Sequence, residues 1–370
     1  MRTLSRRFLL SATGASLAGG LARAADIPPT PPPAPPVIGA ALPLSGDLSL
    51  LGIECLRGIQ LAAGTANLIT ADTISQPQTA AAANSLITAH AALLLGSGDS
   101  DLSYPATAAA ELAQIPFIEL NAPADGLTTR GFKFLLRTGP TTSMIAALAV
   151  ATVLRRYPGR QIGILFNTGA TGGAIAAAAL AGFTAAKAPV ALVIGTPVDA
   201  MDLHDPVGRF QRAGVEVVLH AGGPSDVLAF YQAMQQQSWQ PQAVLGCGPG
   251  YALRANALAL GAAFDGTLVI AAPFYPPSAA ALKAAYTARF GLPPQSPDSL
   301  TAYTGAKLVF DTLAAQGNDP TKLLAALRGT NIAQGALPNG YGIAFDRSGQ
   351  NTRSFVTLQQ WRDQTLLPVT

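Results

Sequence analysis

The stretch that decides the fold is LLLGSGDSDLSYPATAAAELAQIPFIELNA, residues 93–122. It opens with an apolar run typical of a buried strand and breaks into small polar residues at 96–100. It then continues as an alanine-rich helical segment and ends in a second apolar run. Two apolar strands separated by a helix of this length indicate a right-handed βαβ unit in a parallel sheet. The polar loop between strand and helix has the position of a ligand-binding loop.

The same alternation runs along most of the chain in two series. In the first we expect strands at 37–43, 67–74, 91–95 and 115–120, and helices at 50–63, 79–90 and 104–114. A second series begins after 134–138, with helices at 143–156, 173–187, 206–213 and 225–237 and strands at 161–166, 190–195, 215–220 and 242–245. One sheet of about ten or more parallel strands would be unusual. The pattern therefore predicts an α/β protein of two Rossmann-like, doubly wound parallel-sheet lobes.

The last third of the sequence changes character. We expect helices at 279–290, 299–315 and 321–327, followed by strands at 343–345 and 353–361. Such a tail can return to both lobes. We assign 37–138 plus about 274–330 to lobe one and 139–273 plus about 331–370 to lobe two, joined by a hinge.

The first residues have the pattern of an export signal. Arg6 and Arg7 precede a short apolar run, and Ala22-Arg23-Ala24 has the small residues that a signal peptidase requires. We expect a twin-arginine signal over 1–24 and a periplasmic location. The alternative, a retained membrane anchor, is disfavoured by the short apolar run. The proline-rich 25–36 then forms an extended tether.

Composition and charge exclude several classes of function. Hydrophobic residues make up 49% of the chain and charged residues 12%, which argues against disorder. Loss of the four arginines in 1–24 leaves 19 basic and 20 acidic residues, a net charge of about −1. Binding to nucleic acid or an acidic membrane surface is therefore not expected. Cys55 and Cys247 could pair in an exported protein, but we expect two buried thiols.

Four segments, in order, resemble one family. VIGAALPLSGDLSLLGIECLRGIQLA (37–62), FKFLLRTGPTTSMIAALAVATVL (132–154), AYTARFGLPPQSPDSLTAYTGAKLVFDTLAA (285–315) and GYGIAFDRSGQ (340–350) are similar to segments of the periplasmic leucine/isoleucine/valine-binding proteins. These are solute receptors of ATP-driven (ABC) importers and have the type I periplasmic-binding-protein fold. The resemblance implies a monomeric receptor for a small molecule, with importer permease subunits as partners and no cofactor.

Ligands of open α/β sheets bind at the carboxyl ends of the strands. The resemblance matches the loop at 97–100 and Asn121-Ala122 to segments that hold the carboxylate and amine of the ligand in relatives. The alternative is that Asp99 or Ser100 only caps the helix. Our candidate ligand-binding residues are Ser45, Ser97, Gly98, Asp99, Ser100, Asn121, Ala122, Asn167, Thr168, Gly222, Gly223, Cys247, Gly248 and Tyr275.

The ligand is less clear from the sequence. Where relatives place an acidic residue for the ligand ammonium, this chain has Gly-Cys-Gly-Pro at 246–249. A buried ammonium without a countercharge is costly, so the sequence favours a carboxylate or an amide over an α-amino acid. Asp99 or Asp226 could still supply the charge.

Catalysis has weaker support. The segment GSGDS at 96–100 lacks the spacing of a nucleophile elbow, and the glycine-rich segment at 169–173 lacks the lysine of a P-loop. His90, His204 and His220 have no metal-ligand spacing, so we expect surface or packed histidines and no metal. Two alternatives to a transport receptor stay open: a ligand-sensing regulator that uses the same cleft, and a hydrolase that uses Ser97.

Overall fold

The computed structural model describes residues 36–64 and 66–369. The predicted export signal and the tether as far as residue 35 lie outside the described residues. No helix of the described segments is long and apolar enough to cross a membrane.

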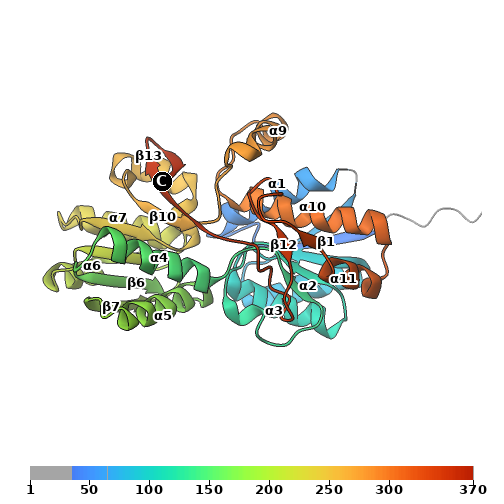
Figure 1. Cartoon of the computed structure of the whole chain (residues 1–370), viewed down its shortest axis with the longest axis horizontal. Helices are drawn as coiled ribbons and strands as arrows, with labels where there is room; N and C mark the ends of the chain where they lie inside the picture. Colours follow the sequence, from blue (N-terminus) through green and yellow to red (C-terminus); the bar gives the residue numbers. More distant parts are fainter. Residues whose placement is uncertain (1–35, 65, 370) are drawn as a thin grey trace, which may run out of the picture. The chain divides into compact units, whose positions relative to one another are not determined.

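Lobe one is built on a five-stranded parallel sheet of order β2-β1-β3-β4-β5 (Figure 1). Helices α1, α10 and α11 cover one face, and α2 and α3 cover the other. The strands are β1 Val37–Leu42, β2 Asn67–Asp72, β3 Ala91–Gly96, β4 Phe117–Glu119 and β5 Leu135–Arg137. The helices are α1 Ser49–Ala63, α2 Gln76–Thr88, α3 Ser100–Leu112, η1 Asp125–Leu127, α10 Asp298–Gln316 and α11 Pro320–Arg328.

Lobe two is built on a seven-stranded sheet of order β14-β13-β10-β9-β8-β6-β7. Helices α4 and α5 pack on one face, and α6, α7 and α8 pack on the other. The strands are β6 Ile162–Asn167, β7 Val190–Thr196, β8 Val217–Ala221, β9 Ala243–Gly246, β10 Leu268–Ala271, β13 Thr357–Arg362 and β14 Thr365–Pro368. The helices are α4 Thr142–Arg156, α5 Ala170–Ala185, α6 His204–Arg212, α7 Pro224–Gln236, η2 Pro249–Ala252, α8 Arg254–Leu260 and η3 Gly261–Phe264.

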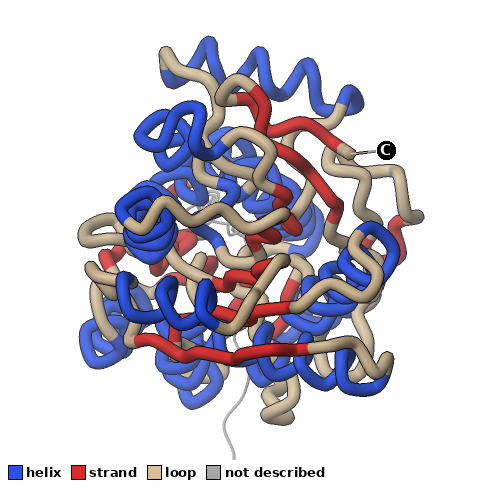
Figure 2. Tube along the Cα trace, turned by 90° about the vertical axis from the view of Figure 1, so that its left-hand side faces the viewer, coloured by secondary structure: helices blue, strands red, loops and turns tan. Residues whose placement is uncertain are grey.

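The remaining elements are short. They are η4 Pro277–Ala279, α9 Ala280–Phe290, and the two-stranded antiparallel pair β11 Asn331–Ile332 and β12 Ile343–Ala344. Figure 2 shows helices, in blue, packed around most of the strands, in red, while the strands near the C-terminus lie at the edge of the molecule. The prediction of two doubly wound α/β lobes is confirmed.

One edge of the lobe-two sheet differs from the predicted parallel arrangement. The chain enters β13 from lobe one, and β13 runs antiparallel to β10. A two-residue turn then reverses the chain into β14. Both turn residues, Asp363 and Gln364, have positive φ, 47° and 57°. Positive φ at both positions is typical of a tight hairpin turn. The strands β10 and β14, each four residues long, were not predicted from the sequence.

The chain passes between the two sheets after β5, after β10 and before β13. The segment before β13 is still paired with lobe one. The amide of Arg137 donates to Gly349 O at 2.8 Å, and the amide of Asn351 donates to Arg137 O at 2.9 Å. The division at residue 330 stays a prediction, and on these pairings we propose that lobe one extends to Asn351.

Cys55 on α1 and Cys247 after β9 are free, buried thiols, as expected. Burial raises the pKa of both. We therefore expect neither thiol to react with a thiol reagent at neutral pH in the folded protein, and both to react after unfolding. Titration with a disulfide reagent, with and without denaturant, measures this. Two thiols that react fast in the native protein would contradict the packing described here.

Candidate functional site

A cavity of about 510 Å³ lies at the carboxyl ends of strands of both sheets. Its size is typical of a site for a small organic ligand. Lobe one contributes the loops after β1, β2 and β3, and lobe two contributes those after β6, β7, β8 and β9. The predicted site residues that line this cavity are Ser45, Asp99, Asn167, Gly222, Gly223 and Gly248.

A second, smaller hollow of about 80 Å³ shares Asp99, Thr171, Gly248 and Pro249 with the main cavity. Its walls include three further predicted residues: Gly98, Asn121 and Cys247. The loops after β3, β4 and β9 therefore meet, as the βαβ pattern predicted.

Five predicted site residues line neither space: Ser97, Ser100, Ala122, Thr168 and Tyr275. Their polar groups have other partners. The Ser97 hydroxyl donates to Asp99 O at 2.7 Å, and the Tyr275 hydroxyl pairs with Ser299 Oγ at 3.2 Å. Ala122 is fully buried, and Thr168 is exposed. Ligand contact by these five stays a prediction.

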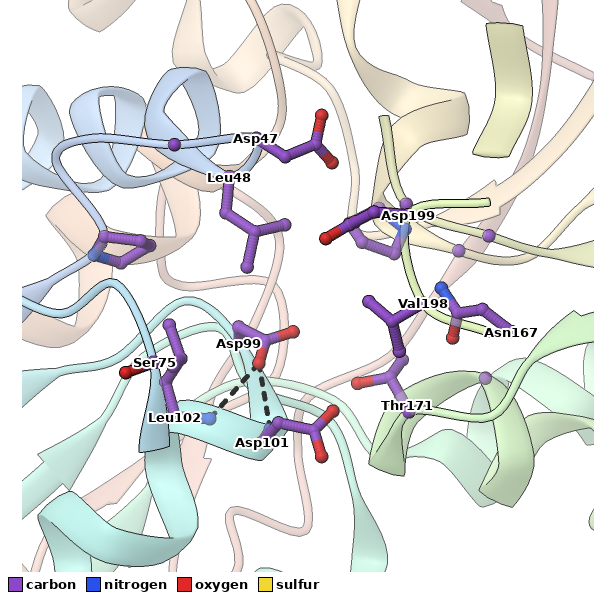
Figure 3. Close-up of a pocket in the computed structure, with 18 of the residues that line it drawn as sticks. Asp47, Leu48, Ser75, Asp99, Asp101, Leu102, Asn167, Thr171, Val198 and Asp199 are labelled. Atoms are coloured by element: carbon purple, nitrogen blue, oxygen red, sulfur yellow. Dashed lines mark hydrogen bonds between the residues drawn. The ribbon is translucent and has the colours of Figure 1, made fainter. Parts of the chain in front are cut away.

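The polar loop after β3 holds a carboxylate of the protein itself. Helix α3 starts at Ser100, four residues earlier than expected, because Asp99 caps it. Asp99 Oδ1 accepts from the amides of Asp101 at 2.9 Å and Leu102 at 3.2 Å (Figure 3). Burial, together with the neighbouring charge of Asp101, raises the pKa of Asp99 to about 6. The alternative that Asp99 caps the helix is thus confirmed, while its side chain also lines the cavity.

A buried residue that the sequence analysis missed, Glu119 at the end of β4, organises two of these loops. Its carboxylate accepts from the amides of Ser97 at 2.8 Å, Asn121 at 3.1 Å and Ala122 at 2.9 Å. It also accepts from the hydroxyls of Ser97 and Ser103. The available signal was a single glutamate in the apolar run IPFIEL at 115–120. A buried carboxylate needs donors, and nearby loop amides supply them.

Aspartates also occupy the helix N-termini of lobe two. Asp226 on α7 is buried, and its Oδ2 accepts from the Gly223 amide at 2.8 Å and from Asn167 Nδ2 at 2.6 Å. At the start of α5, the Ala170 amide donates to Asp101 Oδ2 of lobe one at 2.9 Å. Backbone amides at a helix N-terminus favour an anion, and here the anions are supplied by the chain.

Three hydrogen bonds cross between the lobes at the cavity. Asp101 accepts from Ala170, and the Thr171 hydroxyl donates to Ser100 Oγ at 2.8 Å. On the other side the Ser225 hydroxyl donates to Asp47 Oδ1. In this structure the two lobes are therefore closed on the cavity from both sides.

The cavity is strongly acidic. Asp47, Asp99, Asp101 and Asp199 line it, and within the described residues no lysine, arginine or histidine does. Figure 3 shows Asp47 and Asp199 facing each other on one side, with Asp99 and Asp101 on the other. Although Asp199 is exposed at the rim, partial desolvation of its carboxyl group and the nearby carboxylates of Asp47 and Asp226 raise its pKa to about 6. The sequence left open that Asp99 or Asp226 could supply a countercharge for an ammonium group, and of these two Asp99 lines the cavity.

Glycines bring two cavity loops of lobe two into backbone contact. A Cβ at Gly248 would overlap the carbonyl oxygen of Gly222, and one at Gly250 would overlap that of Gly223. Next to them His220 is fully buried, and its Nδ1 lies 2.6 Å from the Tyr251 hydroxyl. Burial lowers the pKa of His220 to about 3, so this histidine is neutral. His90 and His204 are exposed.

No group of three or more histidine, cysteine, aspartate or glutamate side chains within 36–64 and 66–369 has the geometry to hold a metal ion. The four cavity aspartates lie as two pairs on opposite sides rather than around one point (Figure 3).

Comparison with known proteins identifies the family to which this chain belongs. Residues 35–365 match the sequence pattern of the periplasmic binding protein family. The chain belongs to that family. Among the relatives of this periplasmic binding protein is the Leu/Ile/Val-binding protein homolog 8 of Brucella abortus (strain 2308). The two are 30% identical over 359 residues, which cover 90% of this chain and 89% of the relative. The Leu/Ile/Val-binding protein homolog 7 of Brucella suis is 28% identical over 394 residues, 99% of this chain and 96% of the relative.

Solved structures share the fold of this periplasmic binding protein. A leucine-binding protein of Thermotoga maritima superposes with a TM-score of 0.82 at 17% identity, covering 90% of this chain and 98% of that one. A solute-binding protein of an ABC transporter from Rhodopseudomonas palustris, in complex with p-hydroxybenzoic acid, gives 0.77 at 19%, covering 90% and 95%. At these identities the likeness establishes the fold only.

Proposed function

We propose that this protein is an exported receptor that closes its two lobes on a small organic ligand and presents the closed form to an ABC importer. The observation that carries the proposal is the cavity at the carboxyl ends of both sheets, bordered by hydrogen bonds that cross between the lobes. A ligand that contacts both lobes binds the closed state more tightly than the open state, and this difference in affinity favours closure. Membership of the periplasmic binding protein family supports the same function.

Export and delivery belong to this proposal. The paired Arg6 and Arg7 and the small residues before Ala25 support export by the twin-arginine route into the periplasm. There the closed receptor would meet the permease subunits of the importer. The resemblance to Leu/Ile/Val-binding proteins supports this partner.

Ligand binding is tested on the mature chain, refolded from denaturant to remove any bound molecule. The thermal midpoint is measured with a panel of L-amino acids, carboxylic acids, amides and aliphatic amines. A ligand at roughly a thousand times its Kd adds about 4 kcal/mol to the free energy of unfolding. We expect a rise of several degrees with one class, and a smaller radius of gyration by X-ray scattering. No rise with any class, and no change of radius, would contradict a receptor that closes.

Removing one of the hydrogen bonds that cross between the lobes provides a variant for the same test. In Thr171→Val the hydroxyl that donates to Ser100 Oγ is lost, so closure is less favourable. We expect about a fivefold weaker affinity for the ligand, with little change in the stability of the ligand-free protein. The matched control is Thr184→Val on the same helix, because the Thr184 hydroxyl donates only to Leu180 O. Equal affinities of the two variants would show that this bond does not contribute to closure.

A further inference from the structure

The acidic groups of the cavity form two separate ends. Asp47 and Asp199 lie on one side, and Asp99 and Asp101 lie on the other (Figure 3). Leu48, from lobe one, points into the space between the two ends. The apolar part of the wall also includes Leu102 and Val198. An apolar middle with a pair of carboxylates at each end complements a molecule with an aliphatic chain and a positive group at each terminus.

Three buried polar atoms of these walls have no hydrogen-bond partner within the described residues. Two are acceptors, Oδ2 of Asp47 and Oδ1 of Asn121 at the smaller hollow beside Asp99, and the third is the hydroxyl of Thr73 at the main cavity. A buried acceptor without a donor is costly, so each points to a donor supplied by a ligand. The neighbour of Asp47 is Asp199, whose carboxyl group hydrogen-bonds to Asp47 when protonated and has no proton to donate when ionised. An ammonium group carries three donors and no acceptor, which suits both positions.

Three helix ends at these walls leave little for a ligand carboxylate. The N-terminal amides of α3 donate to Asp99, that of α5 donates to Asp101, and the amide of Gly223 before α7 donates to Asp226. A ligand carboxylate at any of these three helix ends would replace a bond already made and would lie against an aspartate. Like charges at that separation repel, more strongly in a partly buried site than in water.

The cavity lining contains no aromatic residue among the described residues. Quaternary ammonium ligands are commonly held by aromatic faces through cation–π contacts. Carboxylates and amide oxygens instead favour primary ammonium groups, which donate hydrogen bonds.

We propose that the cavity binds an aliphatic amine with at least two primary ammonium groups and no carboxylate, that is, a diamine or a short polyamine. The inference rests on the proposed receptor function and names the ligand class of the same site. Asp47 and Asp199 hold one ammonium group across the lobes, and Asp99, Asp101 and Asn121 hold the other. Because Asp47 and Asp199 come from different lobes, the first ammonium also links the lobes in the closed form.

The direct test is isothermal titration of the mature, refolded protein with putrescine, cadaverine and spermidine, next to butylamine, leucine and benzoate. We expect binding of the diamines or the triamine, and at least tenfold weaker binding of butylamine, because one pair of carboxylates then has no partner. Leucine and benzoate should not bind measurably, because each carries a carboxylate into an acidic cavity.

Asp199→Asn tests the lobe-two end. Asp199 is exposed at the rim and has a φ of +60°, which asparagine adopts readily, so the variant should fold normally. We expect about a tenfold loss of diamine affinity. The control is Asp363→Asn, an exposed aspartate of positive φ in the β13–β14 turn, which should leave affinity unchanged. Equal losses, or no loss in either, would overturn the assignment of this end.

Diamine affinity should also fall on acidification. An ammonium group binds the ionised carboxylates, and two of these have a pKa of about 6 in the ligand-free protein: Asp99, which faces Asp101 and Glu119, and Asp199, which faces Asp47 and Asp226. Between about pH 7.5 and pH 5 we expect diamine affinity to fall roughly tenfold for each carboxyl group that must lose its proton when the diamine binds. Binding should release protons into the buffer at about pH 6. Acidification should therefore reduce diamine affinity less in Asp199→Asn than in the control Asp363→Asn. Equal losses of affinity in the two variants would contradict a role for Asp199.

One further measurement distinguishes an error in the proposed ligand class from an error in the proposed receptor function. The small molecules released by denaturing freshly purified protein are identified by mass spectrometry. A stoichiometric diamine or polyamine supports the inference. A stoichiometric carboxylate, or a titration in which leucine or benzoate binds and the amines do not, overturns the amine class and leaves the receptor standing. No binding of any panel member, together with no released molecule, overturns both.

Discussion

Glu119→Met is expected to lower the free energy of unfolding of the ligand-free protein by about 3–5 kcal/mol. The side chain is fully buried, and its carboxylate accepts from the amides of Ser97, Asn121 and Ala122. Methionine fills a similar volume but accepts none of these bonds, so the amides lose their acceptor in a buried place. Urea unfolding of the mature protein measures the loss. Faster amide exchange over residues 97–103 should accompany it, because the loop that carries Asp99 loses its attachment.

Glu119→Gln separates hydrogen bonding from packing. Glutamine keeps one acceptor oxygen for the amides, and its NH2 group can donate to the hydroxyls of Ser97 and Ser103, which then accept. We expect a loss of about 1–2 kcal/mol, less than that of methionine. Glu111→Met is the matched control: Glu111 also accepts from two backbone amides, those of Lys133 and Phe134, but is only partly buried. Equal stability of Glu119→Met and the unmodified protein would refute the role given to this carboxylate.

Gly248→Ala should change both the stability and the cavity. A Cβ at this position would overlap the backbone carbonyl and amide of Gly222, so the loops after β8 and β9 must move apart. Backbone has no alternative rotamer to relieve the overlap, and we expect a loss of about 2–4 kcal/mol in the free energy of unfolding. Both loops line the cavity, so affinity for the ligand should fall in the same variant by at least tenfold.

Gly173→Ala is the control for this substitution. Gly173 lies in α5 with open space where a Cβ would be. Alanine is the better helix former, so this variant should be as stable as the unmodified protein or up to about 1 kcal/mol more stable. Unfolding in urea and titration with ligand are measured for both. If Gly248→Ala kept full stability and affinity, the two glycine loops would not be in the contact described here.

The order of strands and helices was predictable from the sequence because the apolar runs and the alanine-rich helical stretches alternate with the spacing of βαβ units. The exceptions are short. Leu268–Ala271 is a strand of only four residues, and the antiparallel edge of β13 and β14 depends on where the chain returns from lobe one. Such pairings are set by contacts distant in sequence, which local patterns do not encode.

The position of the cavity was also predictable, and the acidic character of its lining was not. Loops at 45, 98–99, 121, 167, 222–223 and 247–248 all reach the cavity or its smaller neighbour, because parallel strands end at a common edge. Asp47, Asp101 and Asp199 were not predicted as site residues, because each resembles an ordinary turn or helix-start residue in the sequence. Glu119 was not predicted either, because it lies within an apolar strand.

The sequence by itself determined a two-lobed α/β protein with polar loops at the ends of its strands, since hydrophobic periodicity fixes which segments become strands and helices. Only the tertiary structure decided that four aspartates from three separate loops line one cavity, and that the helix ends there are already occupied by carboxylates of the chain. The physical reason is that charge acts through space: the electrostatic character of a cavity is the sum over side chains that folding brings together, whatever their separation along the chain.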